Sequence, residues 1–279
     1  MVFPLGKGEI MKALDAALVA VCAALYSVFG YLIWAFLPIT TPGIGIVRFW
    51  PNVVIPAVFA VLFGPLVGGL GAAIGIFISD MLIHGDPLLS LSAGVTANFV
   101  GFYLIGYISR RKIDWTKLLT ISSIGCLAIA FSSLLVVSYV SIPQIVQNRL
   151  LDENEFAKLL SGIEPTVNAL NLWTAVSIGI FILTVALGFL WTKWRNYGMG
   201  CIIGLGVGST IIGFVVWLYS QIFVLPAAVG GGSQLPFYAA FIWLIWTFAT
   251  EIPFLILLGP PILKVCYRAF PSLKPKEEE

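Results

Sequence analysis

An all-α, polytopic membrane protein is predicted by two features of this sequence. First, 59% of the 279 residues are hydrophobic and only 10% are charged, with a mean hydropathy of +1.02, whereas a soluble domain carries roughly 25% charged residues. Second, the apolar residues are collected in runs of about 20, the length of helix that crosses the hydrocarbon core of a bilayer. We therefore expect residues 1–279 to form a single integral membrane domain.

Eight apolar segments are expected to be helical spans. They cover about 12–37, 51–63, 66–84, 91–109, 118–142, 171–192, 199–225 and 237–263. The first run is longer than the roughly 7–15-residue core of a signal peptide, so we expect it to be a retained span. The second is short and contains Pro51 and Pro56, so its full crossing of the bilayer is left open. Clusters such as Gly64-Pro65 separate the segments and are typical of turns between helices.

The basic residues set the expected orientation, because cytoplasmic loops carry the excess of Lys and Arg. With the N-terminus inside and eight alternating spans, twelve basic residues fall inside and three, Arg48, Arg149 and Lys158, fall outside. Omitting the short second span would move the basic stretch 110–117 outside, against the same rule. We therefore expect a multi-pass protein of the cell membrane with both termini cytoplasmic.

The long polar segment 143–168 is expected to be an extracellular loop in this orientation. Its apolar residues at 150, 151, 156, 159 and 160 have near-helical spacing. Two structures are compatible with this pattern. One is an interfacial or capping helix over the extracellular mouth, and the other is a solvated loop with a short helix.

Small residues recur four apart in three spans, which is the spacing that lets membrane helices pack closely. In the third and seventh spans, which carry Gly71, Gly75 and the series Gly200, Gly204 and Gly208, we favour ordinary packing within the bundle. In the first span the series is longer, so docking of a partner protein is an additional interpretation. This alanine stripe consists of Ala13, Ala17, Ala20 and Ala24.

Ionisable side chains at membrane depth are costly, so each is a functional candidate. Asp80 and His84 are four residues apart and share one helical face, and Asp86 follows them. A metal site built from these three is one interpretation, although one histidine with two carboxylates has low specificity. The other interpretations use Arg48, either as an ion-pair partner of Asp80 or as the group that recognises an anionic or polar ligand in an outward-facing pocket.

Amides and aromatic rings near the outer ends of the first spans are of the types that line small-molecule pockets. An interfacial aromatic belt would equally explain a tryptophan at that depth. The candidate substrate-binding residues are Arg48, Trp50, Asn52, Asp80, His84 and Asn98.

The composition also excludes several classes of site. The four cysteines lie far apart without a C-x-x-C pair, and a single histidine excludes a multi-histidine centre. We therefore expect no metal, no cofactor and no catalytic residues. A net charge of +2 spread over separate loops gives no reason to expect nucleic acid as a partner.

The order of these features resembles the S component of energy-coupling factor (ECF) transporters, the membrane subunit that captures vitamins and related micronutrients. The matching features are the alanine-striped first helix, RFWPNVVIPAVF after a long outer loop, the hairpin FGPLVGGLGAAIGIFISD, and the following PLLSLSAGVTANFVGFYLIGYISRR. The resemblance is good over roughly residues 10–142 and weak in ATEIPFLILLGPPILKV of the last span.

This resemblance implies a fold, a site and partners. In that family the small-residue face of the first helix contacts a transmembrane coupling subunit, a role that would fall here on the alanine stripe, and two cytoplasmic ATPases drive the complex. The substrate binds near the extracellular side, under the loop between the first two helices. The family has six helices, so the core is expected at about 10–142 and 237–268, with 143–236 as an insertion.

Three functions follow, in order of preference. The chain carries no ATP-binding motif, so we expect a non-enzymatic subunit that captures a small vitamin-like molecule and delivers it to an ATP-driven coupling module. A stand-alone secondary transporter would need a coupling group at membrane depth, for which Glu251 is the best candidate. A membrane enzyme that uses Asp80, His84 and Asp86 ranks third.

Overall fold

The computed structural model describes residues 13–37, 49–111, 113–147 and 153–273, and it describes side chains in these ranges except at 139–147 and 153–166. This part of the chain contains helices and no strands. The helices are α1 (Ala13–Phe36), α2 (Val54–Phe63), α3 (Pro65–Ile83), α4 (Pro87–Leu89), α5 (Thr96–Ser109), α6 (Trp115–Gln147), α7 (Glu153–Leu190), α8 (Arg195–Ile222) and α9 (Tyr238–Ala269). Shorter 3-10 turns are η1 (Pro51–Val53), η3 (Thr192–Trp194), η4 (Ala227–Val229) and η5 (Pro271–Leu273), and a π-helical segment, η2 (Ser90–Val95), joins α4 to α5.

The helices agree with the predicted class of a multi-pass membrane protein. Seven segments in the described ranges are long and apolar enough to cross a membrane, with α4, η2 and α5 acting as one span, Pro87–Ser109. The segment Pro51–Phe63 is apolar but shorter, and a helix of this length covers about 20 Å of a hydrocarbon core roughly 30 Å thick. All eight apolar segments expected from the sequence are therefore helical, and seven of them have spanning length.

The short segment begins inside the bundle, not at its end. The Trp50 ring lies against Gly30 of α1, where an added Cβ would meet it at 2.5 Å, and Asn52 Nδ2 donates to the carbonyl of Tyr26, in the middle of α1, at 2.9 Å. At the other end Gly64, with φ of +121°, turns the chain into α3. Because η1 and α2 extend through only part of the bundle, they leave space inside it next to Trp50.

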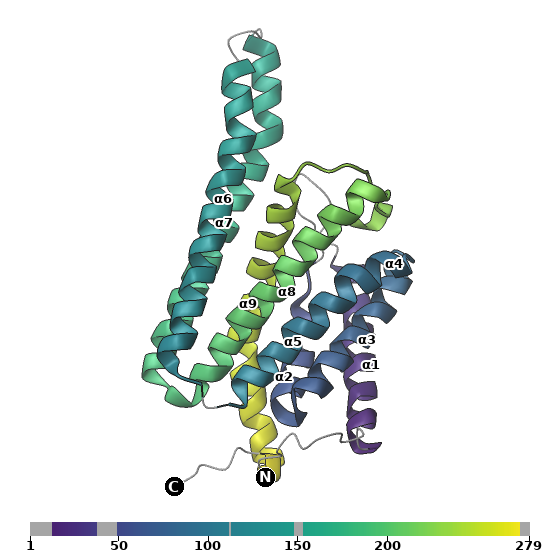
Figure 1. Cartoon of the computed structure of the whole chain (residues 1–279), viewed down its shortest axis with the longest axis vertical. Coiled ribbons are helices and arrows are strands. Elements are labelled where there is room, and N and C mark those ends of the chain that lie inside the picture. Colours follow the sequence, from purple (N-terminus) through teal and green to yellow (C-terminus); the bar gives the residue numbers. More distant parts are fainter. Residues whose placement is uncertain (1–12, 38–48, 112, 148–152, 274–279) are drawn as a thin grey trace.

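Small residues bring the helices into backbone contact. A Cβ on Gly71 of α3 would meet the Cys22 side chain of α1 at 2.6 Å, and one on Gly204 of α8 would meet the carbonyl oxygen of Gly101 of α5 at 2.5 Å. The internal packing predicted for the small residues of the third and seventh spans is thus confirmed. α8, which the sequence had assigned to an insertion, lies against α5 and α9 in the centre of the molecule (Figure 1).

The alanine stripe of α1 lies on the face opposite this packing. α1 buries Val19, Cys22, Ala23, Tyr26, Ser27 and Gly30. Ala13, Ala17, Ala20 and Ala24 are exposed. The stripe is therefore available to lipid or to another protein.

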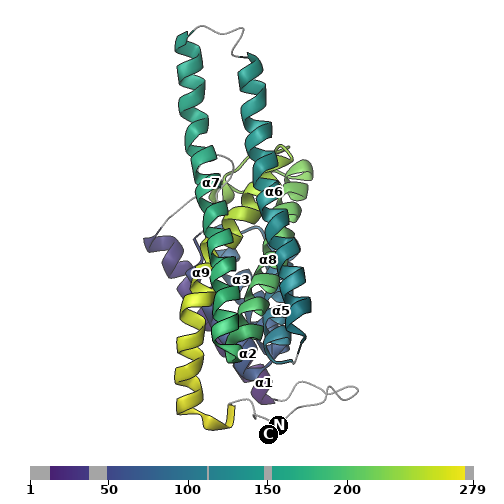
Figure 2. The ribbon, with the colours of Figure 1, turned by 90° about the vertical axis from the view of Figure 1, so that its left-hand side faces the viewer.

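The helices α6 and α7 form a long hairpin that runs beside the other helices and projects past them at one end (Figures 1 and 2). The segment 143–168, expected as a loop, is helical on both sides of 148–152. Its helices continue the hairpin axis and do not fold over the body as a capping helix would. Pro143 and Pro165 lie within these helices, since a proline removes one helical hydrogen bond and need not end a helix.

The first residue of α1 and the last residue of α9 lie at the same end of the molecule, opposite α4 (Figure 1). The even number of passes expected from the sequence stays a prediction. The end that carries α4 is the one that the distribution of basic residues assigns to the outside.

Candidate functional site

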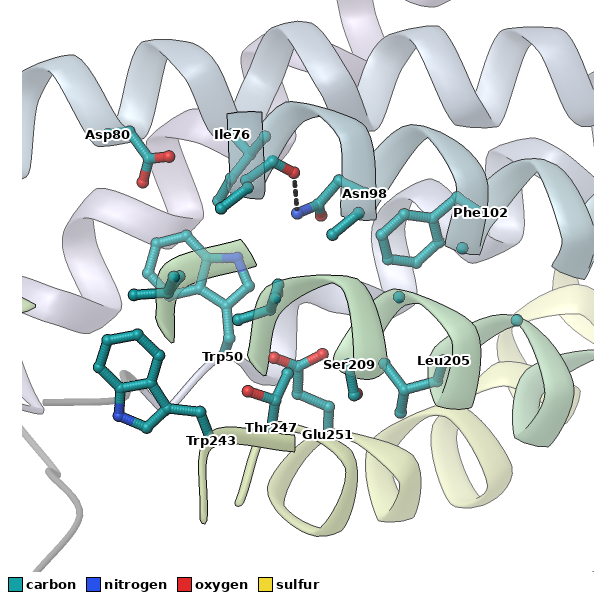
Figure 3. Close-up of a pocket in the computed structure, with 18 of the residues that line it drawn as sticks. Trp50, Ile76, Asp80, Asn98, Phe102, Leu205, Ser209, Trp243, Thr247 and Glu251 are labelled. Atoms are coloured by element: carbon teal, nitrogen blue, oxygen red, sulfur yellow. Dashed lines mark hydrogen bonds between the residues drawn. The ribbon is translucent and has the colours of Figure 1, made fainter. Parts of the chain in front are cut away.

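A cavity of about 120 Å³ lies inside the bundle toward the α4 end. A volume of this order is enough for a small organic molecule. Helices α1, α3, α5, α8 and α9 enclose it, and their aromatic side chains form much of the wall (Figure 3). The aromatic lining residues are Tyr26, Trp50, Phe102 and Trp243.

The π-helical segment η2 shapes the cavity near α3. Ser90 Oγ donates to Asp80 Oδ2 at 2.7 Å, and a Cβ on Gly94 would meet the same oxygen at 2.6 Å. The wider π turn and the missing side chain of Gly94 thus make space for a carboxylate that is only 2% exposed. π-helical turns occur frequently at functional sites, and the sequence alone had not predicted this one.

His84 is held between Asp80 and the start of α4. Its Nε2 lies 3.4 Å from Asp80 Oδ1, and its Nδ1 accepts the backbone N–H of Asp86 at 3.1 Å. These partners assign the proton of a neutral imidazole to Nε2. Both nitrogens are used within the protein, so His84 contributes its ring to the cavity lining.

The Asp86 carboxylate is held by α4 and α8. Its Oδ1 accepts the N–H groups of Leu88 and Leu89 as the N-cap of α4, and its Oδ2 accepts the Tyr219 hydroxyl at 2.7 Å. Desolvation raises the pKa of this carboxyl, but the hydrogen bonds from Leu89, Tyr219 and Leu88 outweigh it, so the pKa is lowered overall. The three side chains of the hypothetical metal site do not converge, and the described residues hold no group of three potential ligands.

A chain of hydrogen bonds fixes the wall near α1 and α5. Trp50 Nε1 donates to the Tyr26 hydroxyl at 3.0 Å, Tyr26 donates to Asn98 Oδ1 at 2.8 Å, and Asn98 Nδ2 donates to the Gly94 carbonyl at 2.9 Å. The amide of Asn98 is therefore oriented by the protein at both ends. This wall is preorganised, and its polar atoms are largely satisfied before a ligand arrives.

The opposite wall carries polar side chains from α8 and α9. Ser209 of α8 and Thr247 and Glu251 of α9 all line the cavity, and Figure 3 shows them close together across from Asn98. The hydroxyls of Ser209 and Thr247 are buried and have no hydrogen-bond partner in the described part of the chain. Glu251 is 8% exposed and lies near the middle of α9.

The structure brings together four of the six predicted substrate-binding residues. Trp50, Asp80, His84 and Asn98 line the cavity. Asn52 is buried beside α1 but is not part of the lining, because its side chain holds η1 against Tyr26. Arg48 lies outside the described residues, so its pairing with Asp80 stays a prediction.

Several lining residues were not predicted. Tyr26, Phe102, Trp243, Ser209 and Thr247 belong to apolar runs, in which hydropathy does not indicate the direction of a side chain. One signal was present for Thr247, which precedes the candidate Glu251 by one helical turn. No protein-family model, curated protein or solved structure matches the chain.

Proposed function

We propose that this protein captures a small, vitamin-like molecule in the cavity between α1, α3, α5, α8 and α9 and hands it to an ATP-driven coupling module, as an S component of an ECF-type transporter would. The cavity carries this proposal. It is mostly apolar, aromatic on several sides and supplied with a few buried polar groups, which is the composition of small-molecule binding sites.

The position of the cavity supports uptake from outside. Its lining includes His84, Leu89 of α4 and Val229 of η4, which lie toward the end assigned to the outer leaflet by the basic residues. At the opposite end of the cavity, Ile105 and Leu205 form an apolar floor. A molecule bound here would be held near the outer face, as expected for a capture subunit.

The arrangement of helices supports a six-helix core that differs from the one expected from the sequence. The cavity is enclosed by α1, α3, α5, α8 and α9, with α2 packed beneath, which makes six segments. The hairpin of α6 and α7 is peripheral to them (Figure 2). In this arrangement α8 is one of the six core segments, and the α6–α7 hairpin is the part added to a family-like core.

The exposed alanine stripe supports docking of a coupling subunit. Small side chains at four-residue spacing allow another helix to approach closely within the bilayer. We expect Ala20→Leu to abolish co-purification with a co-expressed coupling subunit and its ATPases, whereas Val21→Leu, at an exposed position beside the stripe, leaves it intact. Equal co-purification of both variants would contradict docking at the stripe.

Mass spectrometry of small molecules released from the protein tests the capture function. The protein is purified in mild detergent and denatured, and its extract is compared with that of Asp80→Asn. We expect one compound in near-stoichiometric amount from the unaltered protein and less from the variant, because Asp80 lies in the cavity lining. Absence of any compound, even after incubation with a vitamin library, would contradict capture.

The second candidate function, secondary transport, is favoured by one observation. Glu251 lines the cavity, as a proton-coupling carboxylate would. Vesicles that contain only this protein separate the two functions. A secondary transporter accumulates the released compound when a pH gradient is imposed and loses this activity in Glu251→Gln, whereas a capture subunit without its partners does not accumulate the compound.

A further inference from the structure

Two hydroxyls in the cavity differ from most helical hydroxyls of this protein. A serine or threonine inside a helix commonly donates to the carbonyl one turn earlier. Thr250 does so to Trp246 at 2.8 Å, and Ser177 does so to Trp173 at 2.8 Å. Ser209 and Thr247 are 0% and 3% exposed and make no such bond.

A buried hydroxyl without a partner is unfavourable, because it has lost its hydrogen bonds to water. Ser122 and Thr174, on α6 and α7, also lack a described partner but lie outside the cavity lining. Ser209 and Thr247 come from two different helices and face the same cavity (Figure 3). A ligand in the cavity would supply the missing partners.

The neighbouring groups define the chemistry of that ligand. Thr247 and Glu251 are one turn apart on α9 and share a face. A hydroxyl can donate or accept, whereas an ionised carboxylate only accepts. A ligand group that offers an N–H donor beside an acceptor would supply partners for both hydroxyls and would place a donor beside the Glu251 carboxyl group as well.

We infer that Ser209, Thr247 and Glu251 form a polar subsite for the amino-bearing edge of a planar nitrogen heterocycle, such as an aminopyrimidine. The rings of Trp50, Phe102 and Trp243 enclose the flat part of the ligand, and the polar side chains of α8 and α9 form hydrogen bonds with its edge. This inference rests on the proposed capture function and names its substrate class.

Two probes that differ by one amino group test the subsite. They are 4-amino-2-methylpyrimidine and 2-methylpyrimidine, titrated calorimetrically into the full-length protein in detergent. We expect the amino probe to bind at least about tenfold more tightly, which is the value of a hydrogen bond to a charged group. No binding of the amino probe, or equal binding of the two probes, would overturn the inference.

Variants then assign the effect to the two hydroxyls. The double change Ser209→Ala with Thr247→Val should weaken binding of the amino probe about tenfold, because the hydrogen bonds of both hydroxyls to its amino-bearing edge are lost. The midpoint of thermal unfolding without ligand should stay the same or rise, because no protein hydrogen bond is lost. Unaltered binding of the amino probe, or a fall in unfolding midpoint that accounts for the weaker binding, would show that the hydroxyls are not a subsite.

Two control variants match these changes. Ser122→Ala removes an unpartnered buried hydroxyl outside the cavity, and Thr250→Val removes a hydroxyl bonded within α9. Neither should alter the preference for the amino probe, and Thr250→Val alone should lower the unfolding midpoint. Loss of the preference in either control would contradict the assignment to Ser209 and Thr247.

Failure of this inference is distinguishable from failure of the capture function. If mass spectrometry finds a bound compound that has no N–H donor, or one that the double variant retains, the subsite is wrong and capture stands. If the protein neither releases nor binds any small molecule, the capture function itself fails.

Discussion

The glycines in the helices around the cavity and those in the α6–α7 hairpin have different surroundings. Around the cavity, glycines such as Gly204 and Gly71 leave no room for a side chain, because a neighbouring helix lies where the Cβ would be. In the hairpin, Gly125 and Gly179 have nothing within 4 Å of that position, and Gly188 lies against Trp115 of the hairpin itself. The difference indicates that the helices around the cavity are packed tightly against one another, whereas the hairpin has sides that no other helix covers.

The outward surface of the hairpin supports this contrast. Large apolar side chains of α6, including Ile124, Leu127 and Phe131, are 63%, 70% and 62% exposed. In water such a surface would promote aggregation, but lipid solvates it without cost. The outer side of the hairpin thus differs from the helices around the cavity, whose side chains pack against one another.

The largest effect is expected from replacing one glycine in each region by leucine. Gly204→Leu drives the new side chain into the backbone of α5 at Gly101, so we expect a loss of about 3 kcal/mol of stability. Gly125→Leu enters open space and improves helix propensity, so it should change stability by less than about 1 kcal/mol. Thermal unfolding in detergent measures both, and similar losses would contradict the contrast between the regions.

A smaller effect is expected from shortening the hairpin. Replacing residues 138–162 by a Gly-Ser linker removes the part that projects beyond the other helices (Figure 1). Because the residues that line the cavity all belong to other segments, the affinity for the released compound should stay within about twofold. A tenfold loss would mean that the hairpin takes part in ligand binding.

The smallest effect is expected at Asp86, the N-cap of α4, whose carboxylate accepts a hydrogen bond from Tyr219 of α8. The pKa of Asp86 is lowered in the folded protein. Its ionised form therefore stabilises the fold at neutral pH, and this contribution is lost as the pH falls below about 4 and through the folded pKa. Asp86→Asn keeps a capping side chain but no longer titrates.

Unfolding midpoints of both proteins between pH 3 and pH 7 measure this contribution. The midpoint of the unaltered protein should fall more steeply toward pH 3 than that of Asp86→Asn. Tyr219→Phe, which removes one of the hydrogen bonds to the carboxylate, should reduce the steepness. Parallel curves for the three proteins would mean that Asp86 contributes no pH dependence in this range.

The sequence predicted what depends on composition along the chain. Runs of apolar residues located the seven helices of spanning length and the shorter Pro51–Phe63. The prolines marked that second segment as short, and the cost of burying charge drew attention to Asp80 and Glu251, which are buried. It did not predict which helices surround the cavity, because hydropathy carries no information on how one span turns toward another. For this reason α8 was assigned to an insertion, and Ser209 within it was not considered.

The two spans 118–142 and 171–192 were expected, but their continuation as helices into 143–168 was not, for a related reason. Polarity in 143–168 was taken as a sign of a loop, but a helix supported by a neighbouring helix can leave the membrane and continue. Near-helical spacing was present in the segment, and it was the better guide to the backbone there.

The π-helical segment η2 changes the width of one turn without changing the phase of the helix that follows. A π turn holds one residue more than an α-helical path, so deleting a single residue from Ser90–Val95 would let the helix run as a regular α-helix. Because the lost residue and the return to about 100° per residue nearly cancel, Ala97, Asn98 and Gly101 would still face the cavity and α8. The wide turn itself would be lost, and with it the space beside Gly94 that the Asp80 carboxylate occupies. A single residue in this turn thus decides whether a carboxylate can be buried at the cavity, while the residues that α5 presents to the cavity stay the same.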